Sequence, residues 1–219
     1  MKKIAIIIAT IISLCACEKF STLRLNTEDV IMYSLDEHYI ISDGTNVSFS
    51  SENPYIATVN ATTGKVTGMH LGETYINVTA DQGSAKVKVT IKPKYHTIED
   101  PYIKWGASKD DVLEAIGKTP YSYEEYEISY LYGDAYYGDS HIATSYLFKS
   151  NIYLRSVMVL INNNYYAEAA LYLAERFQYI GEKDNVLVFV DALDIKDVKT
   201  TISLYKQSGQ YVIIYTQYD

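Results

Sequence analysis

The sequence predicts a chain of two domains, an all-β sandwich followed by an α+β domain. Composition changes near residue 95, since residues 17–95 carry 7 basic and 9 acidic side chains and residues 96–219 carry 10 and 18. Tyrosine follows the same division, with 18 of the 23 tyrosines after residue 95. Apolar residues alternate through most of the first part, whereas the second part also contains stretches with helical spacing. About 200 residues is a sufficient length for two domains.

Short strands account for most of the first part of the chain. Two alternating segments, 73–80 and 84–91, are joined across Asp81-Gln82-Gly83, which is typical of a hairpin turn. The apolar positions on their faces are Ile76, Val78 and Ala80, then Val87, Val89 and Ile91. Further strands are expected at 46–50, 56–60 and 65–67. This spacing of short strands predicts a sandwich of two packed sheets.

Three motifs follow one another within these strands. They are 50–60 (SSENPYIATVN), 63–68 (TGKVTG) and 72–78 (GETYINV). Their order and composition resemble the bacterial immunoglobulin-like domain, group 2, over about residues 22–92. The resemblance implies a sandwich with Gly64 at a turn position of positive φ. It implies no catalytic residue, because such domains serve as spacers, adhesin stalks and modules of surface enzymes.

The second domain, residues 102–219, is predicted to contain a helix plus three antiparallel strands, twice. Ser108-Lys109-Asp110-Asp111 is a capping-box pattern, and Gly117 ends the helix that follows it. A second helix begins near Tyr166 and carries an apolar stripe. Strands are expected at 126–132, 142–148, 153–161, 185–190, 198–205 and 211–216. Residues 93–101, which include two prolines, are predicted to be a linker.

The beginning of this second domain carries a further pattern. Lys104-Trp105-Gly106 is followed by Ser108, Val112 and Ile116-Gly117. The pattern resembles the helix-and-sheet modules of beta-lactamase inhibitor proteins and of small outer-membrane assembly lipoproteins. That resemblance implies a domain that binds another protein and catalyses no reaction.

The N-terminal residues have the pattern of a secretory leader. Two lysines precede an uncharged run from Ile4 to Leu14, which is too short to span a bilayer. The closing Leu14-Cys15-Ala16-Cys17 resembles the lipobox of bacterial lipoproteins. It implies that residues 1–16 are a signal peptide, that Cys17 is lipidated, and that 17–21 form a tether to the membrane. We therefore expect a lipid-anchored protein of the cell envelope, at the outer membrane and on either of its faces.

The cleaved chain would carry 17 basic and 27 acidic side chains. Nucleic acid is therefore an unfavourable partner, as is an anionic lipid surface. Cys15 and Cys17 are the only cysteines, so the cleaved chain would have neither a disulfide nor a free thiol. Catalytic cysteine and thiolate metal sites are excluded for the same reason.

No residues with the pattern of a catalytic, cofactor or metal site stand out. Gly138-Asp139-Ser140-His141 is similar to the nucleophile block of a hydrolase family, but no later Asp-x-x-His supplies a base. The four histidines have no metal-ligand spacing. The alternative to a binding protein is a glycan-processing or other hydrolase accessory with its active site in residues 102–219. A cleft with converging carboxylates would favour that alternative.

Tyrosines and acids between residues 121 and 141 are the predicted contact residues. They could pack within a sheet, contact a protein or stack on a glycan. The residues assigned to contact with a partner are Tyr121, Tyr123, Tyr136, Tyr137, Asp134 and Asp139. The sequence thus predicts a membrane-anchored, extracytoplasmic, non-catalytic binding or scaffold protein, in which an immunoglobulin-like spacer presents a tyrosine-rich acidic domain to a protein or glycan partner.

Overall fold

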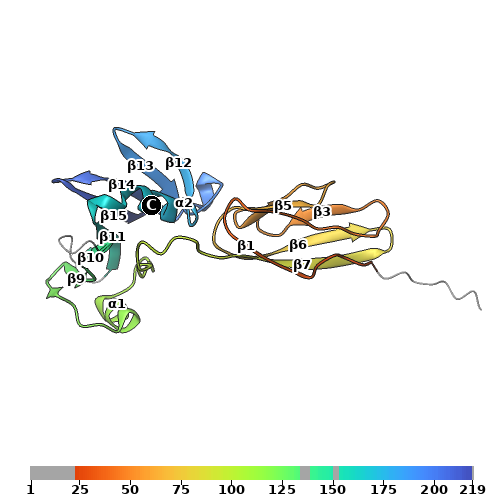
Figure 1. Cartoon of the computed structure of the whole chain (residues 1–219). Coiled ribbons are helices and arrows are strands. Elements are labelled where there is room, and N and C mark those ends of the chain that lie inside the picture. The colour runs from red at the N-terminus through yellow and green to blue at the C-terminus, as the bar shows by residue number, and fades with distance from the viewer. Residues whose placement is uncertain (1–22, 134–138, 150–152, 219) are drawn as a thin grey trace, which may run out of the picture.

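The computed structural model describes residues 23–133, 139–149 and 153–218. Four predicted functional residues lie outside this part of the chain: Cys17, Asp134, Tyr136 and Tyr137. Two bodies follow one another along the described chain, a sandwich and a domain with one large sheet (Figure 1). Within the same residues, no helix is long and apolar enough to span a bilayer.

The first body is a sandwich of two β-sheets. Its strands are β1 (Asp29–Met32), β2 (Glu37–Tyr39), β3 (Ser48–Ser51), β4 (Ala57–Val59), β5 (Lys65–Gly68), β6 (Gly72–Ala80) and β7 (Gly83–Ile91). One sheet has the order β1-β7-β6-β3 and the other has the order β2-β5-β4. Strand β1 runs parallel to β7, and the other pairs are antiparallel.

Alternation along β6 and β7 builds the core of this sandwich. Ile76, Val78, Val87 and Val89 are completely buried between the sheets, because every second side chain of a strand faces the same side. Gly64 has φ 67°, and a Cβ there would lie 2.3 Å from the carbonyl oxygen of Ile40. Only glycine fits that turn. The predicted sandwich, its 81–83 hairpin turn and the positive φ of Gly64 are therefore confirmed.

The second body contains one antiparallel sheet of eight strands. They are β8 (Ser122–Tyr123), β9 (Glu127–Leu131), β10 (His141–Lys149), β11 (Tyr153–Ile161), β12 (Gln178–Lys183), β13 (Val186–Val190), β14 (Thr200–Gln207) and β15 (Gln210–Gln217). Their order is β12-β13-β14-β15-β11-β10-β9-β8. Two four-stranded meanders are therefore joined side by side through β15 and β11.

Two α-helices accompany this sheet, α1 (Lys109–Ile116) and α2 (Tyr166–Ala174). Short 3₁₀ turns precede α2 at Asn163–Tyr165 and β14 at Ile195–Asp197. The Ser108 side chain accepts a hydrogen bond from the N–H of Asp111, whose carboxylate accepts one from the N–H of Ser108. Gly117 closes α1 in the left-handed conformation, with φ 64°. The predicted capping box and glycine stop of this helix are confirmed.

The predicted α+β class of the second domain is not confirmed. Only two α-helices, of 8 and 9 residues, occur in its described part, against eight strands. Each helix is followed by four strands, so the prediction of three strands per helix is wrong. The missed strands are β8, which has two residues, and β12, whose sequence QYIGEK lacks alternation and is interrupted by a bulge near Gly181.

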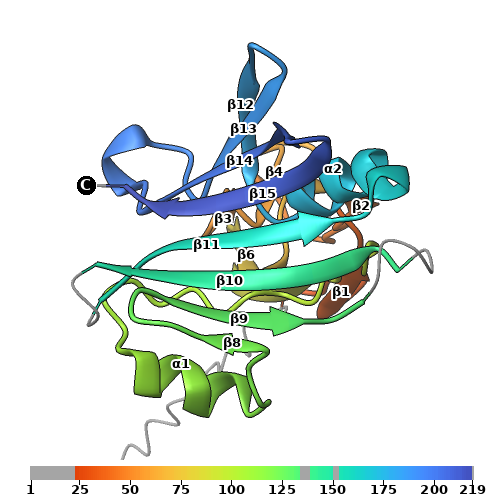
Figure 2. The same ribbon diagram turned by 90° about the vertical axis from the view of Figure 1, so that its left-hand side faces the viewer.

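One face of the large sheet carries the core of the second domain. Ala169, Tyr172 and Leu173 of α2 are buried in a cluster with Tyr146 and Tyr215 of the sheet. The connecting segment contributes as well, since Ile98 is buried in the same cluster. Figure 2 shows the sheet in front of the sandwich, so its other face points away from the first domain.

Candidate functional site

The two domains meet at the C-terminal end of α2. The last carbonyl groups of a helix have no partners within the helix, and they need donors from elsewhere. Here the first domain supplies donors to the two carbonyl groups that directly follow α2, those of Glu175 and Arg176. The backbone N–H of Leu71 donates to the carbonyl oxygen of Glu175 at 2.9 Å, and the Tyr55 hydroxyl donates to that of Arg176 at 3.0 Å. Contact between the domains therefore satisfies the carbonyl groups at the C-terminal end of α2.

The side chain of Glu175 binds the segment that connects the domains. Only 3% of this residue is exposed. Its carboxylate accepts hydrogen bonds from the backbone N–H groups of Lys94 and Tyr95, at 3.0 and 3.2 Å, and pairs with the Arg176 guanidinium. A buried carboxylate is stable only when such partners compensate for its lost hydration. Residues 94–95 are thus fixed to the second domain.

Arg176 connects Glu175 to a second acid. Its Nε lies 2.8 Å from Oδ1 of Asp100, and its guanidinium lies 3.7 Å from the centre of the Tyr172 ring. The hydroxyl of Tyr172 also donates to Asp100. Burial raises the pKa of this tyrosine, so the hydroxyl keeps its proton. We name Tyr55, Leu71, Glu175 and Arg176 the domain joint.

His70 packs beside the domain joint. Its ring stacks on that of Tyr55, with 4.1 Å between the ring centres, and its Nδ1 lies 2.7 Å from the carbonyl oxygen of Tyr55. Because a carbonyl only accepts, Nδ1 carries the proton. Burial lowers the pKa of His70 and raises that of the Tyr55 hydroxyl. Both side chains are therefore neutral at pH 7.

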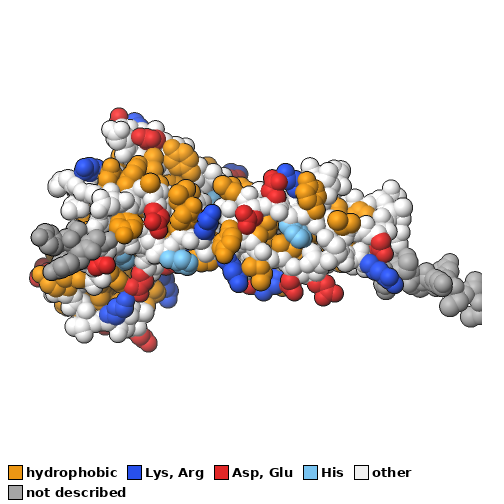
Figure 3. Space-filling view, viewed as in Figure 1, with side chains coloured by type: hydrophobic (Ala, Val, Ile, Leu, Met, Phe, Trp, Pro, Cys, Tyr) orange, Lys and Arg blue, Asp and Glu red, His pale blue; other side chains and the backbone are white. Residues whose placement is uncertain are grey.

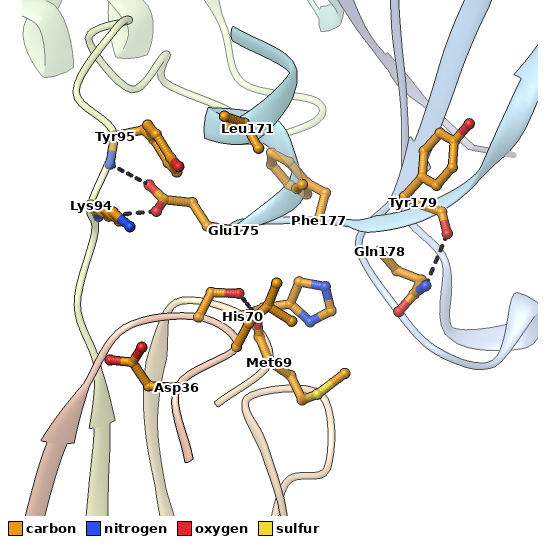
Figure 4. A pocket seen from close by; sticks show the side chains of 13 residues that line it. Asp36, Met69, His70, Lys94, Tyr95, Leu171, Glu175, Phe177, Gln178 and Tyr179 are labelled. Carbon is orange, nitrogen blue, oxygen red and sulfur yellow. Dashed lines mark hydrogen bonds between the residues drawn. The ribbon is translucent and has the colours of Figure 1, made fainter. Parts of the chain in front are cut away.

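A pocket of 420 Å³ opens beside the domain joint. Figure 4 shows Met69 and His70 on one side of it, Leu171, Glu175 and Phe177 across from them, and Lys94 and Tyr95 on the connecting segment. The two carboxylates in its wall, Asp36 and Glu175, both accept hydrogen bonds from backbone N–H groups. Hydrophobic side chains continue across this junction on the face shown in Figure 3.

Leu35 stands at the mouth of this pocket. Its φ is 68°, which is unusual for a leucine, and 77% of the residue is exposed. The conformation is held by a hydrogen bond from its N–H to the carbonyl oxygen of Gly68, at 2.8 Å. The turn between β1 and β2 therefore keeps an apolar side chain in solvent beside the domain joint.

The predicted contact residues are only partly brought together. Tyr121 and Tyr123 lie at the β8 edge of the large sheet and are 74% and 55% exposed. Asp139 is exposed but lies against Gly133, beyond the far end of β9. Tyr126, in the turn between β8 and β9, is exposed too. We name Tyr121, Tyr123 and Tyr126 the tyrosine edge.

Other tyrosines of the same run belong to the core. Tyr130 and Tyr146 are buried, with their rings 5.9 Å apart in an edge-to-face contact. Tyr132 is half-buried and stacks on His141 at 4.1 Å. Tyrosines of this run thus pack into the core at Tyr130 and Tyr146, whereas others leave exposed rings at the sheet edge.

The hydrolase-like block does not assemble a nucleophile and base. The hydroxyl of Ser140 donates to the carbonyl oxygen of Thr97. Nδ1 of the buried His141 accepts from the N–H of Glu99 at 3.2 Å, and its Nε2 lies 2.8 Å from the hydroxyl oxygen of Thr144. Among the residues that the structure describes, no three His, Asp or Glu side chains could together hold a metal ion.

Sequence reasoning missed the domain joint. Tyr55 and Arg176 are 121 positions apart, and neither lies in a pattern that indicates a contact between domains. The one available signal was Glu175-Arg176, a charged pair directly after the apolar stripe of α2. A carboxylate at that position is more commonly exposed, so the signal is weak.

Comparisons with known proteins give one family. Residues 33–91 match the bacterial Ig-like domain (group 2). No curated protein matches the chain. Similar solved structures include a mutant of intimin from EHEC O157:H7, with 15% identity, TM-score 0.28, and 60% of this chain and 90% of that chain covered.

Two structures of the S-layer protein SbsC are also similar. Its domains 5-6 share 15% identity at TM-score 0.29, with 90% of this chain and 83% of that chain covered. Its domains 4-9 share 13% identity at TM-score 0.27, with 90% and 27% covered. The family match, the motifs at 50–78 and the two-sheet sandwich agree with one another, so residues 33–91 form a bacterial Ig-like domain.

Proposed function

We propose that this protein is a lipid-anchored, non-catalytic binding or scaffold protein of the bacterial cell envelope. Its Ig-like domain is a spacer, and its second domain makes the contact with a partner. The domain joint is the observation that carries this proposal. A spacer positions what it carries only when the connection is stiff, and here two carbonyl groups at the end of α2 accept hydrogen bonds from the Ig-like domain.

The lipid anchor is proposed from the sequence. The lipobox-like residues 14–17 support cleavage before Cys17 and attachment of acyl chains to it. We propose the outer membrane as its location, on either face. Metabolic labelling with a clickable fatty acid tests the anchor. The label is expected on the chain and is expected to be absent from Cys17→Ser, whereas equal labelling of both chains would contradict it.

The proposed contact surface is the tyrosine edge. Exposed tyrosines bury large apolar areas on binding at a small entropic cost, and they can also donate a hydrogen bond. Tyr123 of β8 and Tyr121, which directly precedes that strand, supply two such rings. The resemblance of residues 104–117 to beta-lactamase inhibitor modules supports a protein partner rather than a glycan.

Crosslinking in intact cells, followed by purification of the tagged protein, tests this surface. The double variant Tyr121→Ala/Tyr123→Ala is expected to lose a crosslinked partner that the unaltered protein retains. Tyr33→Ala/Tyr39→Ala is the matched control, because it removes two exposed tyrosines from the Ig-like domain. The proposal would be contradicted if both double variants retained the crosslinked partner equally. If no protein partner is recovered and the purified protein hydrolyses glycans of a test panel, the hydrolase alternative replaces this proposal.

A further inference from the structure

We infer that the partner of the tyrosine edge presents a basic segment, whose Lys or Arg side chains stack on the exposed tyrosine rings and pair with Glu124. This inference rests on the proposed function and names the chemistry of the partner. The tyrosine edge already holds a cation of its own chain, the turn beside it carries acidic side chains, and the second domain as a whole is acidic.

Lys109 shows how the tyrosine edge binds an ammonium group. Its Nζ lies 4.8 Å from the centre of the Tyr123 ring and donates hydrogen bonds to the carbonyl oxygens of Glu124 and Glu125. An aromatic face and two carbonyl oxygens together make a favourable environment for a cation. The turn after β8 therefore combines both kinds of cation-binding group, and helix α1 fills one such position from within the chain.

Further groups of the same kind remain exposed beside Lys109. Tyr121 and Tyr126 present their rings to solvent on either side of Tyr123 in the sequence. The carboxylate of Glu124 is exposed and forms no ion pair with any residue that the structure describes. Glu125 accepts a hydrogen bond from the Tyr126 hydroxyl and raises the pKa of that tyrosine, so the hydroxyl keeps its proton.

The charge of the second domain favours the same class of partner. Residues 102–219 carry 16 acidic and 10 basic side chains. An acidic surface accelerates the approach of a basic partner and opposes that of an acidic one. A neutral glycan could stack on the tyrosines, but it would leave Glu124 without a counter-charge. The edge therefore fits a basic protein segment better than a glycan.

Titration calorimetry at low ionic strength tests this chemistry with defined probes. The first probe is a capped peptide of three arginines separated by glycines, and the second replaces each arginine by citrulline, which keeps the shape and removes the charge. We expect saturable binding of the arginine peptide alone. Tyr121→Leu and Glu124→Gln are each expected to weaken it about two- to fivefold, as for exposed cation–π contacts and ion pairs.

Glu182→Gln provides the matched control. Glu182 is exposed on β12, at the opposite edge of the same sheet. Its change to Gln alters the net charge of the protein by the same amount as Glu124→Gln. It is expected to leave peptide binding unchanged. The inference is overturned if the citrulline peptide binds as tightly, if Glu182→Gln weakens binding as much as Glu124→Gln, or if no saturable binding occurs. A crosslinked partner that depends on Tyr121 and Tyr123 would in those cases leave the proposed function standing.

Discussion

At the scale of single residues, His141 makes the stability of the second domain depend on pH. It is 8% exposed, it stacks on Tyr132, and burial lowers its pKa to about 4. The unfolded chain takes up a proton on this residue near its ordinary pKa of about 6.5, whereas the folded protein does so only near 4. The stability that the neutral His141 contributes to the folded protein is therefore fully present above a pH of about 6.5. It is lost as the pH falls toward about 4.

His141→Gln is expected to flatten the pH dependence of the free energy of unfolding across this interval. The full effect of the histidine is on the order of 3 kcal/mol, since one pKa unit corresponds to about 1.4 kcal/mol. Urea unfolding at a series of pH values measures it. The exposed His96, changed to Gln, is the control and should leave the slope unaltered. Equal slopes for His141→Gln and the unaltered protein would contradict the assignment.

At the scale of elements, local sequence determined much of the structure. Strands β6 and β7 followed from alternation, and α1 followed from its capping box and glycine stop, because the interactions that define them lie within a few residues. The two-residue strand β8 and the bulged strand β12 could not be predicted, because a sheet partner rather than local periodicity holds them. The buried Tyr130 and the exposed Tyr121 likewise differ only in their neighbours.

The cap of α1 offers a prediction at the same scale. Ser108→Ala removes the acceptor for the Asp111 N–H and is expected to lower the free energy of unfolding by about 1 kcal/mol. Denaturant unfolding measures the change. Glu114→Ala is the control, since this exposed helix position makes no capping contact and should shift stability by less than about 0.5 kcal/mol. Equal effects of both variants would show that the cap is not responsible.

At the scale of the whole molecule, the order of the domains could be predicted but their connection could not. The change of composition near residue 95 and the Ig-like motifs indicated where one domain gives way to the next. The contact itself depends on Leu71, Tyr55 and Glu175, which come together only after both domains have folded. No local pattern encodes such a contact, and the candidate site was therefore predicted only at the tyrosine edge.

Glu175→Gln tests whether the domain joint holds the molecule together. The variant keeps the shape of the side chain but removes the charge that binds two backbone N–H groups, and it leaves Arg176 with Asp100 as its acidic partner. Removing one member of a buried ion pair typically destabilises by about 3–5 kcal/mol. Here much of that loss should fall on the contact between the domains, because Glu175 binds the connecting segment.

We therefore expect Glu175→Gln to broaden the distribution of particle dimensions in small-angle X-ray scattering and to separate thermal unfolding into two transitions. Tyr55→Phe, which removes only the hydroxyl that donates to Arg176, should produce the same changes to a smaller extent. Glu182→Gln is a suitable control, because it removes one negative charge from the same domain at an exposed position of β12, outside the domain joint and the connecting segment. A scattering profile and a single transition identical to those of the unaltered protein would mean that the two domains are held together by other contacts than the domain joint.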